Sequence, residues 1–539
     1  MPLKALRAVV AAGLGIAAVA AGAAPASLAA TDGPTRLAVA VPLVVPPTDT
    51  GLIEATALTQ YTREGGLLDR QLDALEGRQV AIGVDPRIIA SIRVLGSAAP
   101  ETATAWLERL DALTNQTFPL AYADTDLALV TQAGAPAVPG AEGFAFAIDP
   151  AAFAPPVEGT PTPTPTATPD PLEPPPLPDA TAVTAWEYTL DAVAWPRDDT
   201  VVAGDLPRFA ASGYESAIVS SGNLTREDES GAAVVDGFRV AVSDAAISAA
   251  LRQAVGSAEY DIGAVIAAAS ATGDDGTVLA TMDRSVPMST DRLAAVLDAL
   301  AADPGVELVP LSQVLGEAAA AASIADRPEP ADRVRLAAAL LESDAATARF
   351  ATVATDPAAI TDPERLRMLA LLSNAWAANG EGWASAAADA VAVGDALRDS
   401  VQIASQSTLN LLGDQRTSLP VPISNALDQE VTVYVTVRPT TARLSVGEER
   451  VAVTVPAQSQ ANALVPVQAI TNGSVYVRVT LTSGAGIDIG DQRFVQMNVQ
   501  AGWETPVVVV VAILVFAVFV VGIVRTILRR RRERAEAAG

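Results

Sequence analysis

The sequence predicts a multidomain protein: an α/β domain, then a helical subdomain, an immunoglobulin-like β-sandwich and one transmembrane helix. Three observations predict this order. Short apolar runs alternate with amphipathic segments in the first part of the chain, alternating apolar and polar residues follow position 416, and one long apolar run lies near the C-terminus. A chain of 539 residues is long enough to bury several cores.

The predicted α/β domain covers residues 31–315. Its apolar runs end in polar or turn residues, as at residues 80–84 before Asp85 and 118–122 before Asp124, and a helical segment usually follows each run. Such alternation favours a parallel sheet. About seven units predict a TIM-like or seven-stranded parallel barrel, and a doubly wound open sheet is the main alternative.

A segment rich in proline and threonine interrupts this domain at residues 155–179. It lacks the large apolar residues of a core, so we expect an extended, polyproline-like chain. Because the βα pattern resumes at residues 186–195, we interpret the segment as an insertion within one domain.

The pattern changes twice after the α/β domain. Residues 316–415 are rich in alanine and leucine and predict a helical subdomain with almost no strand signal. Residues 416–500 alternate between apolar and polar side chains, most clearly at 431–437 and 475–479, with turn signals between the runs. This second stretch predicts a β-sandwich of the immunoglobulin or fibronectin type without its cysteine pair.

The two ends of the chain predict export and anchoring. Residues 1–30 hold Lys4, Arg7, an apolar run and then small residues, which is the layout of a cleaved signal peptide, with a retained anchor as the alternative. Residues 507–524 form an unbroken apolar run, long enough to cross the roughly 30 Å hydrocarbon layer. The arginine-rich tail at 525–539 predicts a cytoplasmic C-terminus and an N-terminus outside. We therefore expect a single-pass protein of the cell membrane, with the lipid bilayer as one partner.

Composition excludes several kinds of chemistry. The formal net charge of -27 disfavours nucleic acid as a partner. There is no cysteine and no histidine, and the only lysine is Lys4 in the predicted signal. Disulfides, zinc sites with Cys or His ligands, thiol nucleophiles and imidazole bases are thereby excluded, and we expect no cofactor. Any acid–base catalysis must use Asp, Glu or Tyr, with Arg as an electrostatic clamp.

Polar residues that follow the predicted strands are the site candidates, because the loops after parallel strands meet at one face. Paired carboxylates at that face would suit glycoside hydrolysis. The candidate catalytic residues are Asp85, Asp124, Asp126 and Asp283. The candidate ligand-binding residues are Tyr122, Asp198, Asp244 and Arg284.

The same residues have a structural interpretation. Asp85, the Asp124–Asp126 stretch and Asp244 stand just before predicted helices, where side chains that cap the helix N-terminus are expected, and Tyr122 can be a rim or core aromatic. A cluster of four or more acids could hold Ca²⁺, but the sequence has no EF-hand loop and we predict no metal site.

The order of parts resembles a family of exported actinobacterial single-pass membrane proteins of unknown function, often encoded beside the lipid II flippase. The resemblance rests on short landmarks in a fixed order along most of the chain. These are Gly83-Val84-Asp85-Pro86, Leu120-Ala121-Tyr122-Ala123-Asp124-Thr125-Asp126, Ala194-Trp195-Pro196, Leu308-Val309-Pro310-Leu311-Ser312, residues 419–437, and Ala501-Gly502-Trp503. It implies a role in cell-envelope biogenesis, with no established reaction.

The α/β region is also similar to glycoside hydrolase and polysaccharide deacetylase barrels, an analogy of fold alone. The deacetylase metal site resembles one Asp with two His, and this chain has no histidine.

Two functions are expected from these observations. The leading hypothesis is a non-catalytic scaffold of cell-envelope, or peptidoglycan, biogenesis that binds a cell-wall glycan or an envelope-assembly membrane protein. The alternative is a carbohydrate-active hydrolase that uses paired aspartates at the barrel mouth. A catalytic pair needs two carboxylates within about 5 to 10 Å across an open cleft, whereas a scaffold can use its acids as helix caps.

Overall fold

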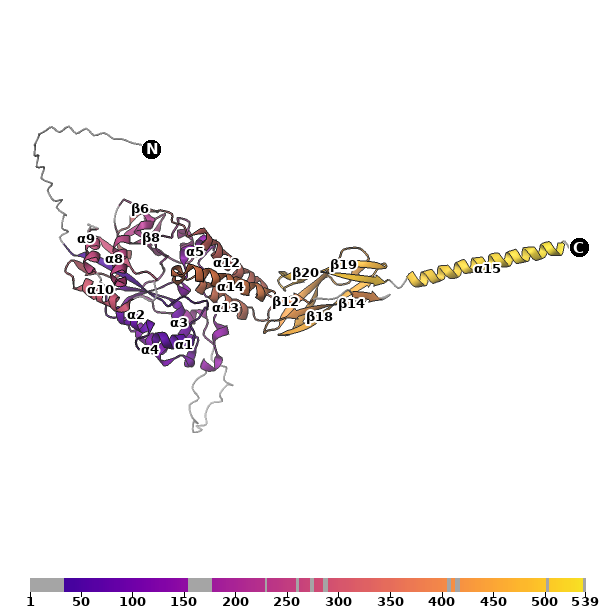
Figure 1. Cartoon of the computed structure of the whole chain (residues 1–539), viewed down its shortest axis with the longest axis horizontal. Helices are drawn as coiled ribbons and strands as arrows, with labels where there is room; N and C mark the ends of the chain where they lie inside the picture. The colour runs from indigo at the N-terminus through magenta and orange to yellow at the C-terminus, as the bar shows by residue number, and fades with distance from the viewer. Residues whose placement is uncertain are drawn as a thin grey trace, which may run out of the picture.

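The computed structural model describes residues 33–153, 177–227, 230–257, 261–271, 276–284, 289–404, 409–412, 417–500 and 504–536. The molecule is elongated, with the α/β part at one end, smaller β-sheets in the middle and a long helix at the other end (Figure 1). This confirms the predicted mixed α/β, multidomain class. The predicted signal peptide and residues 154–176 of the proline-rich segment lie outside the described residues.

The α/β part is built on one large sheet, which has eleven strands among the described residues. Its strands are β1 (Thr35–Leu43), β2 (Ala81–Val84), β3 (Gln116–Pro119), β4 (Val193–Ala194), β5 (Ser216–Ser220), β6 (Leu224–Arg226), β7 (Ala232–Val235), β8 (Phe238–Ser243), β9 (Thr277–Thr281), β10 (Val306–Leu308) and β11 (Ala320–Ile324). The neighbours along the path β3-β2-β1-β9-β8-β5-β4 are all parallel. Strand β10 runs parallel to the start of β1, β7 pairs antiparallel with β8, and β11 lies between β7 and β6.

The two ends of this parallel path come close together. No strand ladder joins β3 to β4 within the described ranges, but the backbone N–H groups of Thr189 and Leu190 donate to the carbonyl of Thr117 at 3.1 and 3.0 Å. The ring of Phe118 in β3 lies 5.8 Å from the ring of Trp195, the residue that follows β4. The parallel sheet is therefore present as predicted, and the closed barrel stays a prediction.

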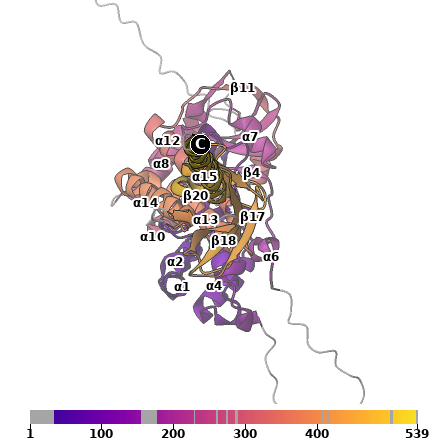
Figure 2. The same ribbon diagram turned by 90° about the vertical axis from the view of Figure 1, so that its right-hand side faces the viewer.

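A helix or a 3-10 turn follows each of the parallel strands, whereas strands β5 to β8 have no α-helix between them. The helices of the α/β part are α1 (Ala55–Thr62), α2 (Leu67–Leu75), α3 (Pro86–Arg93), α4 (Glu101–Asp111), α5 (Leu127–Gln132), α6 (Ala180–Thr184), α7 (Leu206–Ala211), α8 (Ala245–Gly256), α9 (Ile262–Ala271), α10 (Thr290–Ala302) and α11 (Leu311–Gly316), with 3-10 turns η1 (Gly96–Ala98), η2 (Tyr122–Asp124), η3 (Ala145–Ala147), η4 (Pro150–Phe153) and η5 (Ser221–Asn223). Seen from the α15 end, α1, α2 and α4 lie on one side and α7 and β11 on the opposite side (Figure 2).

Strand β1 shows why this sheet lies at the centre of the fold. Its residues are buried on both faces, as a central parallel strand requires. Leu37 and Val41 pack in one apolar cluster with Leu68 and Leu72 of α2, while Ala40 belongs to a second cluster on the other face. Each fully buried leucine side chain contributes about 2 kcal/mol of hydrophobic stabilisation.

The predicted helical region consists of α12 (Ala331–Ala351), α13 (Ala358–Leu371), the 3-10 turn η6 (Asn374–Ala378) and α14 (Gly380–Arg398). Trp376 and Trp383 bury their rings here and donate their indole N–H groups to the carbonyls of Ala370 and Leu371. These tryptophans pack in one cluster with Tyr122 of the α/β part. The helical region is thus fixed directly against the end of the α/β sheet.

Three strands fall within the range predicted to be helical: β11, β12 (Val401–Ile403) and β13 (Leu409–Leu412). The sequence of β11 is Ala-Ala-Ala-Ser-Ile, a composition that favours a helix. Its antiparallel pairing with β6 and parallel pairing with β7 override that local preference. Helix propensity is a weak guide where the tertiary structure supplies strand partners.

The middle part contains two sheets around one shared core. The further strands are β14 (Thr417–Asn425), β15 (Val431–Pro439), β16 (Leu444–Val446), β17 (Val451–Val455), β18 (Ser459–Ala469), β19 (Gly473–Thr482) and β20 (Asp488–Gln500). The sheets have the orders β12-β14-β18-β16 and β13-β20-β19-β15-β17. Val421 and Val465 of the first sheet share an apolar cluster with Val433 and Val477 of the second. The two-sheet packing matches the predicted alternation, and the immunoglobulin type stays a prediction.

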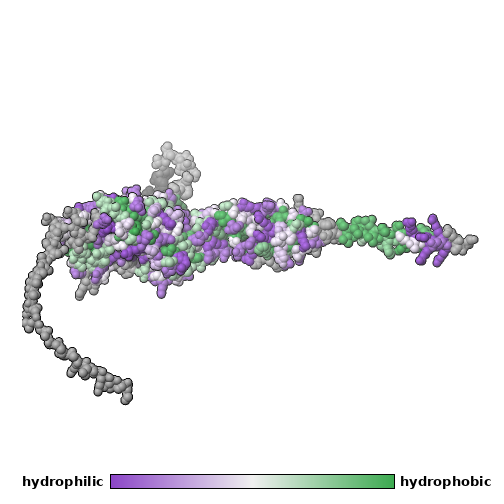
Figure 3. Space-filling view, turned by 90° about the horizontal axis from the view of Figure 1, so that it is seen from above, coloured by the Kyte–Doolittle hydropathy of each residue, from purple (hydrophilic) through white to green (hydrophobic). Residues whose placement is uncertain are grey.

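The last element is α15 (Glu504–Glu536), which extends away from the rest of the molecule. The most apolar 18-residue window of its segment Val507–Ala535 has a mean hydropathy of 3.5 and is not buried against other described residues. Figure 3 shows this apolar stretch followed by a hydrophilic end. In the described part of the chain, one helix is long and apolar enough to span a membrane, consistent with single-pass anchoring.

Candidate functional site

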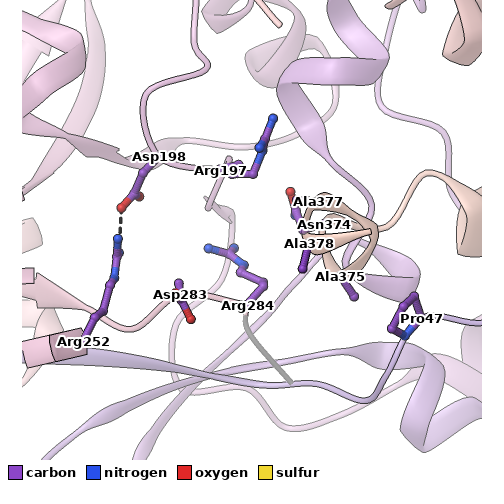
Figure 4. A pocket seen from close by; sticks show the side chains of 10 residues that line it. All are labelled: Pro47, Arg197, Asp198, Arg252, Asp283, Arg284, Asn374, Ala375, Ala377 and Ala378. Atoms are coloured by element: carbon purple, nitrogen blue, oxygen red, sulfur yellow. Dashed lines mark hydrogen bonds and ion pairs between the residues drawn. The ribbon is translucent and has the colours of Figure 1, made fainter. Parts of the chain in front are cut away.

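A pocket of about 210 Å³ lies where the carboxyl ends of the parallel strands meet the helical region (Figure 4). Arg197 and Asp198 come shortly after β4, Asp283 and Arg284 shortly after β9, and the turn η6 closes the opposite side. The residues that line the pocket are Pro47, Arg197, Asp198, Arg252, Asp283, Arg284, Asn374, Ala375, Ala377 and Ala378. This is the edge of a parallel sheet at which ligands bind in α/β proteins.

One wall of the pocket is a charge pair. The Nη2 atom of Arg252 donates to Asp198 at 2.6 Å, and its Nε atom donates to the carbonyl of Thr281 at 2.9 Å. Helix α8 supplies Arg252, while the loop after β4 supplies Asp198. Both side chains are partly exposed, so this pair presents charge to the pocket.

Arg284 forms the centre of the pocket floor. Its guanidinium group lies 3.9 Å from the ring centroid of Trp195 and donates to the Trp195 carbonyl at 2.7 Å. On its other side, the Nε atom is 3.4 Å from the carboxylate of Asp124. Because it is held by a cation–π contact, a hydrogen bond and an ion pair, Arg284 has a fixed position.

Asp124 lies behind the pocket lining, in contact with two lining residues. Besides its pair with Arg284, it accepts a hydrogen bond at its carboxylate from the amide group of Asn374, 3.1 Å away, and a second at its backbone carbonyl, 3.0 Å away. Burial raises the pKa of Asp124 to about 7, against the opposing effect of Arg284. Asp124 and its neighbour Ala123 have φ angles of 49° and 58°, a left-handed conformation that costs free energy for residues other than glycine.

Asp85 caps a helix and does not line the pocket. Its carboxylate accepts a hydrogen bond from the backbone N–H of Arg87 at 2.9 Å and lies 3.6 Å from the Arg87 guanidinium. Both side chains are 1% exposed. Burial raises the pKa of Asp85, while Arg87 acts in the opposite direction.

Asp126 belongs to a group of two buried acids and two arginines that joins the α/β part to α12. Arg333 lies 3.0 Å from Asp126 and 3.3 Å from Glu329, and Arg197 lies 3.6 Å from Asp126 and bonds directly to Glu329. The two carboxylates are completely buried, and burial raises the pKa of Glu329. Sequence reasoning missed Arg197, Glu329 and Arg333, although the i,i+4 spacing of Glu329 and Arg333 was a visible signal.

The other two candidates lie outside the pocket lining. Tyr122 is a core residue whose hydroxyl donates to the carbonyl of Gly51 at 2.8 Å. Asp244 caps α8 by accepting a hydrogen bond from the backbone N–H of Ile247 at 2.8 Å. Asp126 likewise caps α5 through the N–H of Leu129. The cap interpretation is therefore confirmed for Asp85, Asp126 and Asp244.

Of the eight predicted residues, the structure brings Asp198, Asp283 and Arg284 to the pocket lining. Arg252 and Asn374 were missed, because Arg252 reaches in from the body of α8 and Asn374 comes from a distant helical region. Within the described ranges, no group of three or more acids is placed to hold a metal ion.

Comparison with known protein families gives one match. The family described as "Family of unknown function (DUF6049)" matches residues 263–536. The chain belongs to the DUF6049 family. The matched region includes Asp283, Arg284 and the turn η6 of the pocket, whereas Arg197, Asp198 and Arg252 lie before it. No curated protein matches this DUF6049 chain.

Several solved structures resemble short parts of this DUF6049 protein. The native conformation of Escherichia coli α2-macroglobulin is 16% identical, with 18% of this chain and 7% of that chain covered and a TM-score of 0.15. WR4, an MSP family member of Caenorhabditis elegans, is 12% identical, with 17% and 90% covered and a TM-score of 0.13. The YadV chaperone is 10% identical, with 19% and 52% covered and a TM-score of 0.15. The chain spans only a small fraction of the macroglobulin's length.

Proposed function

We propose that this DUF6049 protein is a membrane-anchored, extracytoplasmic binding protein of the cell envelope, which holds a polar ligand in its strand-end pocket and does not cleave it. The observation that supports this most directly is how the predicted catalytic acids are used. Of the four predicted catalytic acids, Asp283 lines the pocket. Asp85 and Asp126 cap helices, pair with Arg87 and Arg333 respectively, and do not line the pocket. They stabilise the fold and are not available to a substrate.

The carboxylates at the pocket also favour binding over hydrolysis. Asp198 is engaged by Arg252, and Asp124 is only 4% exposed beneath Arg284. A hydrolase of the glycosidase type needs one acid to protonate the leaving group and a second to act as nucleophile or base. A fixed arrangement of alternating Asp and Arg side chains is better suited to hold a ligand through charge-assisted hydrogen bonds.

The location rests on the C-terminal helix and on the predicted signal. An apolar helix followed by a cluster of arginines supports an anchor with its C-terminus inside the cell. The proposal includes closure of the parallel sheet into a barrel, because the contacts of Thr117 with Thr189 and Leu190 link β3 to the segment just before β4. A closed barrel would gather the loops after the strands around one mouth.

One observation favours the alternative, a carbohydrate-active hydrolase. With its pKa raised to about 7, Asp124 can hold a proton near neutral pH, as a general acid must. It also has a strained backbone, a feature that clusters at active sites. In this alternative Asp124 would protonate a leaving group that reached it past Arg284.

The experiment is complementation of a deletion strain by variants of the full chain. Ala377→Leu places a larger side chain in the pocket from an exposed position and should abolish the cellular role with unchanged membrane level and melting temperature. Ala442→Leu, at an exposed position after β15, is the matched control and should complement. Full complementation by Ala377→Leu would overturn the binding proposal. Loss of complementation by a folded Asp124→Asn variant would favour the hydrolase.

A further inference from the structure

The size of the pocket limits the ligand to a small molecule. Its volume of about 210 Å³ lies below the range of roughly 300 to 1,000 Å³ that is typical of sites for drug-sized ligands. One compact ligand of a few heavy atoms fills it. An oligomeric ligand could place only a single terminal unit inside the pocket.

The pocket has a charged side and an apolar side. Figure 4 shows Asp198, Arg252, Asp283 and Arg284 gathered together, with η6 across from them. The opposite side is formed by the small apolar side chains of Pro47 and of the alanines at 375, 377 and 378. A ligand that fits this arrangement has a charged head and a short apolar side chain.

The charged side presents both signs together. Asp198 and Asp283 attract a cationic group, and Arg252 and Arg284 attract an anionic group. A purely anionic ligand would place its charge beside the two carboxylates, and a purely cationic one beside the three guanidiniums of Arg197, Arg252 and Arg284. A zwitterion satisfies both, so that each charge of the ligand meets a side chain of opposite charge.

The guanidinium groups keep donors for such a ligand. The Nη2 and Nε atoms of Arg252 bond to Asp198 and Thr281, while its Nη1 atom donates to no described residue. In Arg284, Nη2 donates to the Trp195 carbonyl and Nε lies 3.4 Å from Asp124, while Nη1 donates to no described residue. Two N–H donors from different arginines can hold one carboxylate.

The lining disfavours a neutral sugar ring. The described residues of the lining include no aromatic side chain. The ring of Trp195, which contacts Arg284, is itself buried. A sugar would therefore lack an aromatic ring to stack on, and its neutral hydroxyl groups would bond less strongly to these charged side chains than an ammonium or a carboxylate group.

We propose that the pocket binds a small zwitterion, namely an α-amino acid or short peptide with a free ammonium group, a free carboxylate and a small apolar side chain. This inference rests on the proposed function, because it names the ligand class of the same pocket. The ammonium group lies between Asp198 and Asp283, the carboxylate meets Arg252 and Arg284, and the side chain contacts the alanines of η6.

The test is isothermal titration of the full chain in detergent with alanine and three kinds of control ligand. N-acetylalanine lacks the ammonium group, alanine amide lacks the carboxylate, and N-acetylglucosamine represents a neutral sugar. Loss of either charge should weaken binding about tenfold or more, because each removes charge-assisted hydrogen bonds. Tighter binding of the sugar, or equal binding of all three alanine derivatives, would overturn the zwitterion proposal.

Variants assign the binding to this pocket. Ala377→Leu should abolish alanine binding, and Asp283→Asn should weaken it about tenfold, since a charged partner of the ammonium group is lost. Asp244→Asn changes an aspartate outside the pocket lining and is the matched control, with binding unchanged. Binding of alanine that is unaffected by Ala377→Leu would place the site elsewhere and overturn the proposal.

The outcomes separate the ligand class from the proposed function. If Ala377→Leu fails to complement but no alanine derivative binds, the ligand class is wrong and the binding function stands. If Ala377→Leu complements fully and alanine does not bind, both proposals fall.

Discussion

The carboxylate of Asp124 lies 3.4 Å from the Nε atom of Arg284, and the two side chains are only 4% and 8% exposed. This buried pair links the floor of the pocket to the left-handed turn at residues 123–124. The side-chain amide of Asn374 donates a hydrogen bond to the same carboxylate and so connects it to the helical region. The protonation state of Asp124 therefore affects the junction between the two parts of the molecule.

We predict that Asp124 makes stability depend on pH. Its pKa is about 7 in the folded protein and 3.8 as an unperturbed side chain, so between these values the folded state binds the extra proton. The resulting stability is fully present below pH 4 and is lost as the pH rises through about 7. Asp124→Asn removes this dependence. Relative to wild type, the variant should gain on the order of a few kcal/mol between pH 4 and pH 8, at about 1.4 kcal/mol per pKa unit.

The measurement is the melting temperature of both proteins across that pH range, with Asp298→Asn as the control. Asp298 is exposed, and its hydrogen bond from Arg78 lowers its pKa, so its contribution has the opposite sign: it builds up as the pH rises towards the unperturbed value and is fully present above it. A difference between Asp124→Asn and wild type that stays constant from pH 4 to pH 8 would contradict the prediction.

The second prediction concerns the group of two buried acids and two arginines. Arg333→Met removes one cation next to Asp126 and Glu329, both fully buried, and also the contact of the guanidinium with the ring of Trp383, 5.1 Å away. Removing one partner of a buried ion pair typically costs about 3 to 5 kcal/mol, because the remaining charge is left without compensation. Thermal or urea unfolding of the variant should show a loss of this size.

Arg349→Met is the matched control for this second variant. Arg349 also lies on α12, but its partner Glu342 and its own side chain are exposed, so its loss should cost at most about 1 kcal/mol. Equal effects of the two substitutions would show that this group does not stabilise the contact between the α/β part and α12.

The sequence was informative where the structure depends on local chemistry. The caps at Asp85, Asp126 and Asp244 were predictable because an aspartate just before a helix accepts a hydrogen bond from a nearby backbone N–H. The placement of Asp198, Asp283 and Arg284 at the pocket followed from their position after apolar strands.

The sequence was less informative where the structure depends on contacts between distant segments of the chain. Arg197 and Glu329 are 132 positions apart, and no local pattern shows that they meet. Asn374 reaches the site because two buried tryptophans fix η6 against the α/β part, a packing event that leaves no motif. The strand β11 was missed for the same reason, since its partners β6 and β7 and not its alanines determine its conformation.

The third prediction separates an ordinary cap from a cap inside a buried ion pair. Asp244→Ala should cost about 1 kcal/mol, because it removes one capping hydrogen bond at a partly exposed position. Asp85→Ala should cost several kcal/mol, roughly 3 to 5, because it also leaves the buried guanidinium of Arg87 without its counter-charge. The double variant Asp85→Ala/Arg87→Met should recover part of that loss. Unfolding measurements that give equal losses for Asp244→Ala and Asp85→Ala would contradict this account.

The last prediction concerns the anchor. The apolar segment of α15 is exposed along its whole length, so in water it would carry a large uncompensated apolar surface. A bilayer removes that surface from water, and the helix satisfies its own backbone hydrogen bonds there. Deleting residues 507–539 while keeping the first thirty should therefore release a folded protein outside the cell, because this helix makes no packing contribution to the other parts. Fractionation and the melting temperature of the released protein are the measurements.

As a control, deleting only residues 533–539 should leave the protein in the membrane, since the apolar run remains intact. A truncated protein that stays in the membrane fraction would show that a second anchor, such as an uncleaved signal, holds the chain.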